Sequence, residues 1–216
     1  MKYVFLGIFI IASVIHLYAS LKKDKKLRGW SKIFIVSSLL GWYWVAADKV
    51  MPVFLLALFF SWLGDVLLIP NSMKLFTAGG ISFGVSHILF ILTYNKNVNF
   101  SLIPLWIIIV AAVVYITAAC FVFKGLKNHL PKPLFYPMFF YLLANGLMNC
   151  FALYQLLSVK NTAALIVFIG AALFFCSDSV LFYTRFKKDT IFKNHFVVML
   201  TYIFAEFLIV LGTLMF

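Results

Sequence analysis

The sequence predicts an all-α membrane protein, a bundle of about eight transmembrane helices, on three observations. Hydrophobic residues make up 65% of the 216 positions and charged residues 11%, against roughly 45–50% and about 25% in soluble domains. The apolar residues form long runs, and only short polar loops separate them. A run of about 20 apolar residues crosses a bilayer, so we expect one integral membrane domain over residues 1–216.

Eight runs qualify when the chain is taken in order. The expected helices cover residues 3–20, 32–47, 51–69, 75–94, 102–123, 137–157, 162–183 and 194–215. The first run follows a single lysine and lacks a small-residue cleavage site, so it is interpreted as a retained helix. The second is the weakest, because it is short and lies between Lys32 and Asp48. Short connections predict that successive helices are antiparallel neighbours in one bundle.

Lysine and arginine predict the orientation. Fourteen of the 18 basic residues fall in the loops after the first, third, fifth and seventh helices, and four fall on the other side. Cytoplasmic loops of membrane proteins carry the excess of Lys and Arg. Both termini are therefore expected on the non-cytoplasmic side of a cell membrane.

Two carboxyl groups interrupt the apolar runs, Asp65 in residues 60–69 and Asp178 in residues 174–181. An ionised group at the bilayer centre costs roughly 2.5–3.5 kcal/mol on insertion scales, so such residues usually have a function. Counting from the helix ends places both in the cytoplasmic half at similar depth. One acid of a pair can hold a proton while the other stays anionic, which suits acid catalysis or proton-coupled transport. A structural lock between helices is the third reading.

Other polar residues share the faces of neighbouring helices. His87 lies near the middle of its run, and Tyr141, Asn145 and Asn149 recur at a spacing of four, as do Tyr202 and Glu206. Residues four apart lie on one face of a helix, so these faces can meet the two acids. Gly80 and Gly84 form a GxxxG pair, for which close helix packing is the favoured reading.

Several other classes are not favoured. The net charge of +12 comes from short loops, which is typical of contact with anionic lipid headgroups and not of nucleic-acid binding. The three cysteines form no CxxC pair and lie in apolar runs, so neither a disulfide framework nor a zinc site is indicated. Metal binding by the two aspartates and His87 stays open, although the paired histidines of zinc helices are absent.

The sequence around Asp65 resembles that around Asp178, four expected helices later and in the same orientation. Duplication of a four-helix unit would explain a weak 4+4 internal repeat. Chance similarity between apolar helices explains it nearly as well.

The motifs together resemble the YhhN-like lysoplasmalogenase family. The resemblance rests on Ser61-x-x-Gly64-Asp65-x-x-Leu68, Phe76-x-x-Gly79 leading to His87, Gly170 to Leu181 with Ser177-Asp178, then Phe186 and Tyr202. These motifs cover about a third of the chain. The last helix departs from the family pattern, with Glu206 where a glutamine is usual.

The resemblance implies an integral membrane enzyme that hydrolyses the vinyl ether bond of lysoplasmalogens to a fatty aldehyde and glycerophosphocholine or glycerophosphoethanolamine. Its two aspartates correspond to Asp65 and Asp178, and the expected supporting residues are Ser61, His87, Asn145, Ser177, Tyr202 and Glu206. The expected partners are a lysophospholipid, water and the bilayer, with no cofactor or metal. The oligomeric state is left open.

The alternative is a proton-coupled transporter of a small amphiphile that uses the same acids. Transporters often interrupt their core helices with Gly or Pro at the binding site. Pro52, Pro70, Pro104 and Pro137 all lie at the ends of expected helices, which counts modestly against transport.

Overall fold

The computed structural model describes residues 2–187 and 195–216, and these form eight α-helices without a strand. The helices are α1 (Lys2–Lys22), α2 (Lys25–Ala46), α3 (Pro52–Leu67), α4 (Met73–Asn95), α5 (Leu105–Leu126), α6 (Phe135–Val159), α7 (Thr162–Phe186) and α8 (His195–Leu214). Three 3-10 turns, Phe100–Leu102, Lys127–His129 and Lys132–Leu134, lie in the loops. The expected all-α bundle is confirmed.

Within the described residues, six helices are long and apolar enough to cross a membrane: α1, α4, α5, α6, α7 and α8. α3 is apolar but has only 16 residues, and α2 carries Lys25, Lys26 and Arg28 in its first turn. Membrane sequence is thus confirmed for six of the eight runs. The start of the last expected helix, residue 194, and the loop residues Lys188 and Lys193 lie outside the described residues.

The expected helix bounds hold to within about three residues except in α2, which begins at Lys25 and not at Lys32. The Asp24 side chain caps this helix by accepting hydrogen bonds from the backbone N–H groups of Lys26 and Leu27, at 3.0 and 3.1 Å. Capping satisfies N–H groups that a helix start otherwise leaves open. The cap therefore extends α2 by two turns of basic sequence beyond its apolar run.

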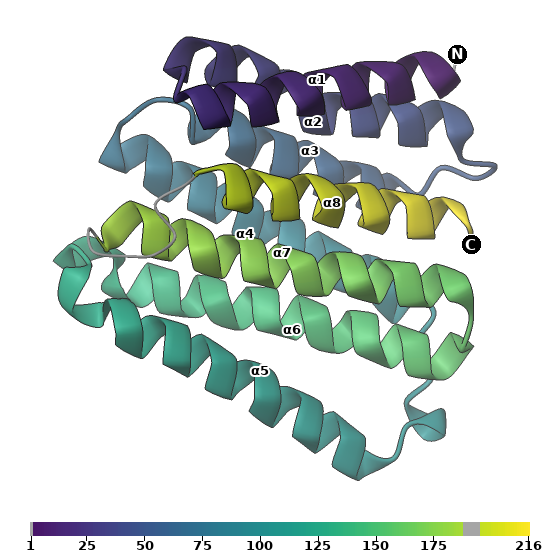
Figure 1. Cartoon of the computed structure of the whole chain (residues 1–216). Helices are drawn as coiled ribbons and strands as arrows, with labels where there is room; N and C mark the ends of the chain where they lie inside the picture. The colour runs from purple at the N-terminus through teal and green to yellow at the C-terminus, as the bar shows by residue number, and fades with distance from the viewer. Residues whose placement is uncertain (1, 188–194) are drawn as a thin grey trace.

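Consecutive helices pack on each other as expected except α4 and α5, because α6 lies between them and packs on both. α8 lies beside α1, α2 and α7 (Figure 1). α5 lies at the edge of the bundle and packs mainly on α6. Both termini are at one end (Figure 1). The other end holds the α1–α2, α3–α4 and α5–α6 connections, the end of α7 and the start of α8, and we call it the basic end because most of the described lysines and arginines lie there.

Glycines set the closest helix contacts. A Cβ on Gly64 of α3 would lie 2.6 Å from the Phe83 ring of α4, and one on Gly79 would lie 3.2 Å from the Gly64 carbonyl oxygen. A Cβ on Gly170 of α7 would lie 2.9 Å from the Ala205 carbonyl oxygen of α8. These contacts bring α3 against α4 and α7 against α8, the two hairpins that carry Asp65 and Asp178.

Candidate functional site

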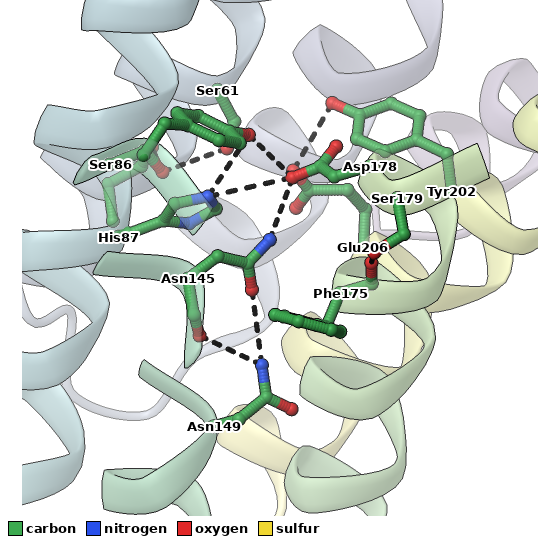
Figure 2. A network of polar contacts seen from close by, with 12 residues as sticks. Ser61, Ser86, His87, Asn145, Asn149, Phe175, Asp178, Ser179, Tyr202 and Glu206 are labelled. Carbon is green, nitrogen blue, oxygen red and sulfur yellow. Dashed lines mark hydrogen bonds and ion pairs between the residues drawn. The ribbon is translucent and has the colours of Figure 1, made fainter. Parts of the chain in front are cut away.

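Asp178 on α7 is buried among polar groups from α4 and α6 (Figure 2). Its Oδ2 accepts hydrogen bonds from the Tyr141 hydroxyl and from Asn145 Nδ2 at 2.8 Å, and His87 Nε2 lies 3.7 Å away. No described residue contacts its other oxygen, Oδ1. Asp178 therefore has one oxygen with two hydrogen-bond donors and one oxygen without a hydrogen-bond partner among the described residues.

The hydrogen bonds around Asp178 have a direction. The Tyr141 hydroxyl has a single proton, which it donates to Asp178. The contact of 3.2 Å between Tyr141 and His87 then requires His87 to donate from Nε2. His87 Nδ1 is buried without a partner in the described part of the chain. A chain of hydrogen bonds thus runs from His87 to Tyr141 and from Tyr141 to Asp178.

Asn149 supports this cluster from one turn further along α6. Its Nδ2 donates to the backbone and side-chain oxygens of Asn145, at 3.0 and 3.1 Å, and Tyr115 of α5 donates to its Oδ1 at 3.2 Å. Because the Asn145 oxygen is held in this way, its amide nitrogen points to Asp178 (Figure 2).

Asp65 on α3 is 1% exposed and has partners on both oxygens. Lys32 Nζ of α2 lies 3.1 Å from Oδ1, and the Tyr202 hydroxyl of α8 donates to Oδ2 at 2.9 Å. A buried ammonium beside a carboxylate favours the charged form of both groups. Lys32 is therefore the counter-charge of Asp65 and opposes the effect of burial, which favours the neutral form of a carboxyl group.

Glu206 lies one turn beyond Tyr202 on α8 and is completely buried. The Tyr202 oxygen is 3.3 Å from Glu206 Oε1 and 2.9 Å from Asp65. A phenol can donate only one proton at a time, so Asp65 and Glu206 share the Tyr202 hydroxyl as acceptors, and the shorter contact is the one to Asp65. Glu206 Oε2 has no partner among the described residues.

The Asp65 and Asp178 clusters adjoin each other. The Phe174 ring contacts His87, with centroids 5.1 Å apart, and Tyr202, at 5.4 Å. Figure 2 shows His87 and Asn145 on one side of Asp178 and Tyr202 and Glu206 on the other. The structure thus brings together six of the eight predicted site residues: Asp65, His87, Asn145, Asp178, Tyr202 and Glu206.

The remaining two, Ser61 and Ser177, connect neighbouring helices. Ser61 Oγ lies 2.9 Å from Ser86 Oγ, and Ser86 donates to the Ala57 carbonyl oxygen at 2.8 Å, which joins α3 to α4. Ser177 donates to the Val198 carbonyl oxygen at 2.9 Å and joins α7 to α8. Each serine stabilises the hairpin that carries its neighbouring acid.

An apolar groove of about 350 Å³ opens between α4 and α6. Gly80 and Gly84 form part of its wall, and no atom of another element lies within 4 Å of a Cβ built on either. The expectation that this GxxxG pair packs against a helix is therefore wrong. Gly64 and Gly79 make the close contact, and the GxxxG glycines leave space open. Tyr141, which contacts Asp178, also lines the groove.

A second cavity of about 270 Å³ lies at the basic end. Its polar lining comes from α1, α2, α7 and α8 and consists of His16, Lys25, Arg28, Lys32, Arg185 and His195. Phe76 lines both this basic pocket and the apolar groove. One pocket therefore reaches Asp178 through Tyr141, and the other reaches Asp65 through Lys32.

Sequence reasoning missed Lys32 as a site residue, because the second helix was expected to begin there. Tyr141 was placed on the right face of its helix but not counted among the site residues. The signal for Lys32 was the Asp24 cap, which moves the lysine from a loop into the second turn of α2. For Tyr141 it was the i, i+4 spacing to Asn145.

A bundle of apolar helices around buried acids, open on one side to an apolar groove, defines a polytopic membrane protein with a polar site in its interior. Comparison with protein families matches residues 27–213 to the YhhN family, which covers most of the chain. The chain belongs to the YhhN family, and membership links it at family level to lysoplasmalogenases. No curated protein and no solved structure matches it significantly.

Proposed function

We propose that the protein hydrolyses the vinyl ether bond of lysoplasmalogens, releasing a fatty aldehyde and a glycerophospho-base. The observation that carries the proposal is that each buried acid is linked to a different cavity. Asp178 connects through Tyr141 to the apolar groove, and Asp65 connects through Lys32 to the basic pocket. A single-chain lipid with an anionic headgroup matches these two cavities, and its ether bond lies between chain and headgroup.

The slow step in vinyl ether hydrolysis is protonation of carbon. A proton adds to the alkenyl carbon that is not bonded to the ether oxygen. The resulting positive charge is shared between the oxygen-bonded carbon and the ether oxygen. Water adds to the cation and loses a proton, and the resulting hemiacetal separates into an aldehyde and the glycerol hydroxyl. The reaction consumes one water and returns the catalytic proton. It requires a positioned acid and negative charge near the cation.

In our proposal Asp178 is the acid and Asp65 provides the negative charge. No described residue donates a hydrogen bond to Asp178 Oδ1, and Asp178 is hydrogen-bonded to Tyr141, which lines the groove. In this position Asp178 can deliver a proton to a chain in the groove. Asp65 is the acid with a fixed cationic partner, Lys32, and our proposal assigns it the ionised role for that reason. His87 and Asn145 orient Asp178, and Tyr202 orients Asp65.

The test uses the purified full chain in detergent with 1-alkenyl lysophosphatidylethanolamine and lysophosphatidylcholine, and aldehyde release is measured. Asp65→Asn and Asp178→Asn should each lower the rate by about a hundredfold or more, the size of a lost acid–base step. Asp48→Asn is the matched control, because it removes an exposed carboxyl outside the site. Full activity in both site variants would overturn the mechanism. Folded wild-type protein that releases no aldehyde at any pH would overturn the function in favour of a transporter.

A further inference from the structure

The described residues that line the basic pocket carry an excess of positive charge. Four cationic side chains line it, from Lys25, Arg28, Lys32 and Arg185. Among the residues that the structure describes, no carboxylate lines it, and the only ion pair of these four is that between Lys32 and Asp65. Cations that are partly removed from water are stabilised by an anionic partner. The pocket is therefore suited to an anion.

Two of its side chains are held in place before any ligand arrives. Arg185 donates from Nη2 to Asn71 Oδ1 at 2.9 Å, and its guanidinium lies 5.4 Å from the centre of the Phe76 ring. His16 is 3% exposed, and its Nδ1 lies 3.0 Å from Ser31 Oγ. Because Ser31 donates its own proton to the Leu27 carbonyl oxygen at 2.7 Å, His16 must donate from Nδ1.

We propose that this pocket binds the phosphate of the lysophospholipid substrate, an inference that rests on the proposed function. Arg28 and Arg185 present guanidinium groups, which bind phosphate oxygens through paired N–H donors. Phe76 separates the pocket from the groove, so phosphate in the pocket and chain in the groove would place the ether bond between the two cavities. The Lys32 ammonium is then shared between phosphate and Asp65.

The amine of the headgroup is not recognised. Binding of an ammonium or a choline would need a carboxylate or an uncovered aromatic face. The described lining holds no carboxylate, and its one aromatic ring, Phe76, is already covered by Arg185. Choline and ethanolamine headgroups should therefore bind with equal affinity, while removal of the phosphate should weaken binding strongly.

Binding can be measured separately from catalysis with labelled 1-O-hexadecyl lysophosphatidylcholine, which has no vinyl ether to hydrolyse. Unlabelled 1-O-hexadecyl lysophosphatidylethanolamine should displace it with equal potency, and 1-O-hexadecylglycerol should bind at least about tenfold more weakly, as expected for lost charged hydrogen bonds. Arg28→Gln and Arg185→Gln should each weaken binding of the lysophospholipid about tenfold and leave that of hexadecylglycerol unchanged. Lys160→Gln, which removes a lysine at the opposite end, is the matched control and should change nothing.

Further competitors separate the sources of phosphate. Equal displacement by dioleoyl phosphatidylglycerol would make the pocket a general contact for bilayer phosphate, and displacement by inorganic phosphate at similar concentration would make it a simple anion site. Either result, or unchanged affinity in both arginine variants, overturns the proposal. Because the labelled ligand cannot react, a chain that cleaves no vinyl ether can still pass or fail this test.

Discussion

Lys32 connects the buried acid Asp65 to the basic pocket. Its ammonium lies 3.1 Å from Asp65, and its side chain lines the basic pocket. Both partners are largely buried, with side chains 14% and 2% exposed. Removal of one partner from a buried ion pair leaves an uncompensated charge, which costs more than removal of both.

We expect Lys32→Met to lower the free energy of unfolding by about 3 kcal/mol or more, the usual effect of breaking a buried pair. The double variant Lys32→Met/Asp65→Asn should recover most of that loss, because no unpaired charge is left. Titration of the purified protein with a denaturing detergent compares the two. Equal stability of the single and double variants would show that Lys32 and Asp65 do not form a charged pair.

Glu206 is the third buried acid of the site. It is buried, shares Tyr202 with Asp65, and has one oxygen without a partner in the described part of the chain. An orphaned buried polar atom costs about 1–3 kcal/mol.

Glu206→Gln leaves a polar atom at the unpartnered position, so it should change stability by less than about 1 kcal/mol, and it should retain aldehyde release, because the amide oxygen can still accept the Tyr202 hydrogen bond. Thermal unfolding and the aldehyde assay check this, with Asp48→Asn as the control for loss of an acid. If Glu206→Gln abolished activity, Glu206 would belong to the catalytic groups.

At the residue scale the sequence predicted the acids well and their partners less well. A carboxyl group in an apolar run is conspicuous in any window, so Asp65, Asp178 and Glu206 could be identified without a structure. Lys32 could not, because a lysine at the edge of an apolar run usually belongs to a loop. Its role depends on the tertiary contact between α2 and α3.

At the scale of elements, α4 has two different glycine faces. Gly79 meets the backbone of α3, whereas Gly80 and Gly84 border the apolar groove with nothing near their Cβ positions. Small residues four apart indicate close approach on many membrane helices. The sequence alone does not distinguish a close contact from an open groove, since both need the absence of a side chain.

Gly84→Leu should fill the groove without disturbing the fold. A leucine that displaces about two methylenes of the alkenyl chain, at roughly 0.8 kcal/mol each, should raise KM about tenfold. A substrate with a shorter chain should be less affected. Gly7→Leu in α1 is the matched control, because its Cβ also has nothing within 4 Å but lies outside the groove. Equal KM values for both variants would show that the chain binds elsewhere.

At the scale of the whole molecule, the equivalent position of the acids is the remaining argument for a repeat. Asp65 lies on the third helix and Asp178 on the seventh, and each is near the basic end of a hairpin closed by glycine contacts. The 4+4 repeat stays a prediction. The bundle itself was predictable because apolar length determines helix number. The cavities were not, because they depend on which faces of the helices remain uncovered.

The distribution of basic residues between the two ends of the bundle predicts which side of the membrane the basic pocket faces. The basic end carries Lys25, Arg28, Lys32 and Arg185 around the pocket, and excess Lys and Arg marks cytoplasmic segments. We therefore propose that the pocket opens to the cytoplasm and that both termini lie on the opposite side. Substrate would then enter from the cytoplasmic leaflet, and the glycerophospho-base would be released into the cytoplasm.

Cysteine labelling tests this orientation. In a variant without Cys120, Cys150 and Cys176, exposed Asn97 and Asn128 lie at opposite ends of the bundle and can each be replaced by Cys. A maleimide that cannot cross membranes should label Asn97→Cys in intact cells and Asn128→Cys only after permeabilisation. The reverse pattern would place the basic pocket at the outer leaflet. Entry of substrate from the cytoplasmic leaflet would then be ruled out. Because labelling requires no catalysis, orientation and activity can be decided independently.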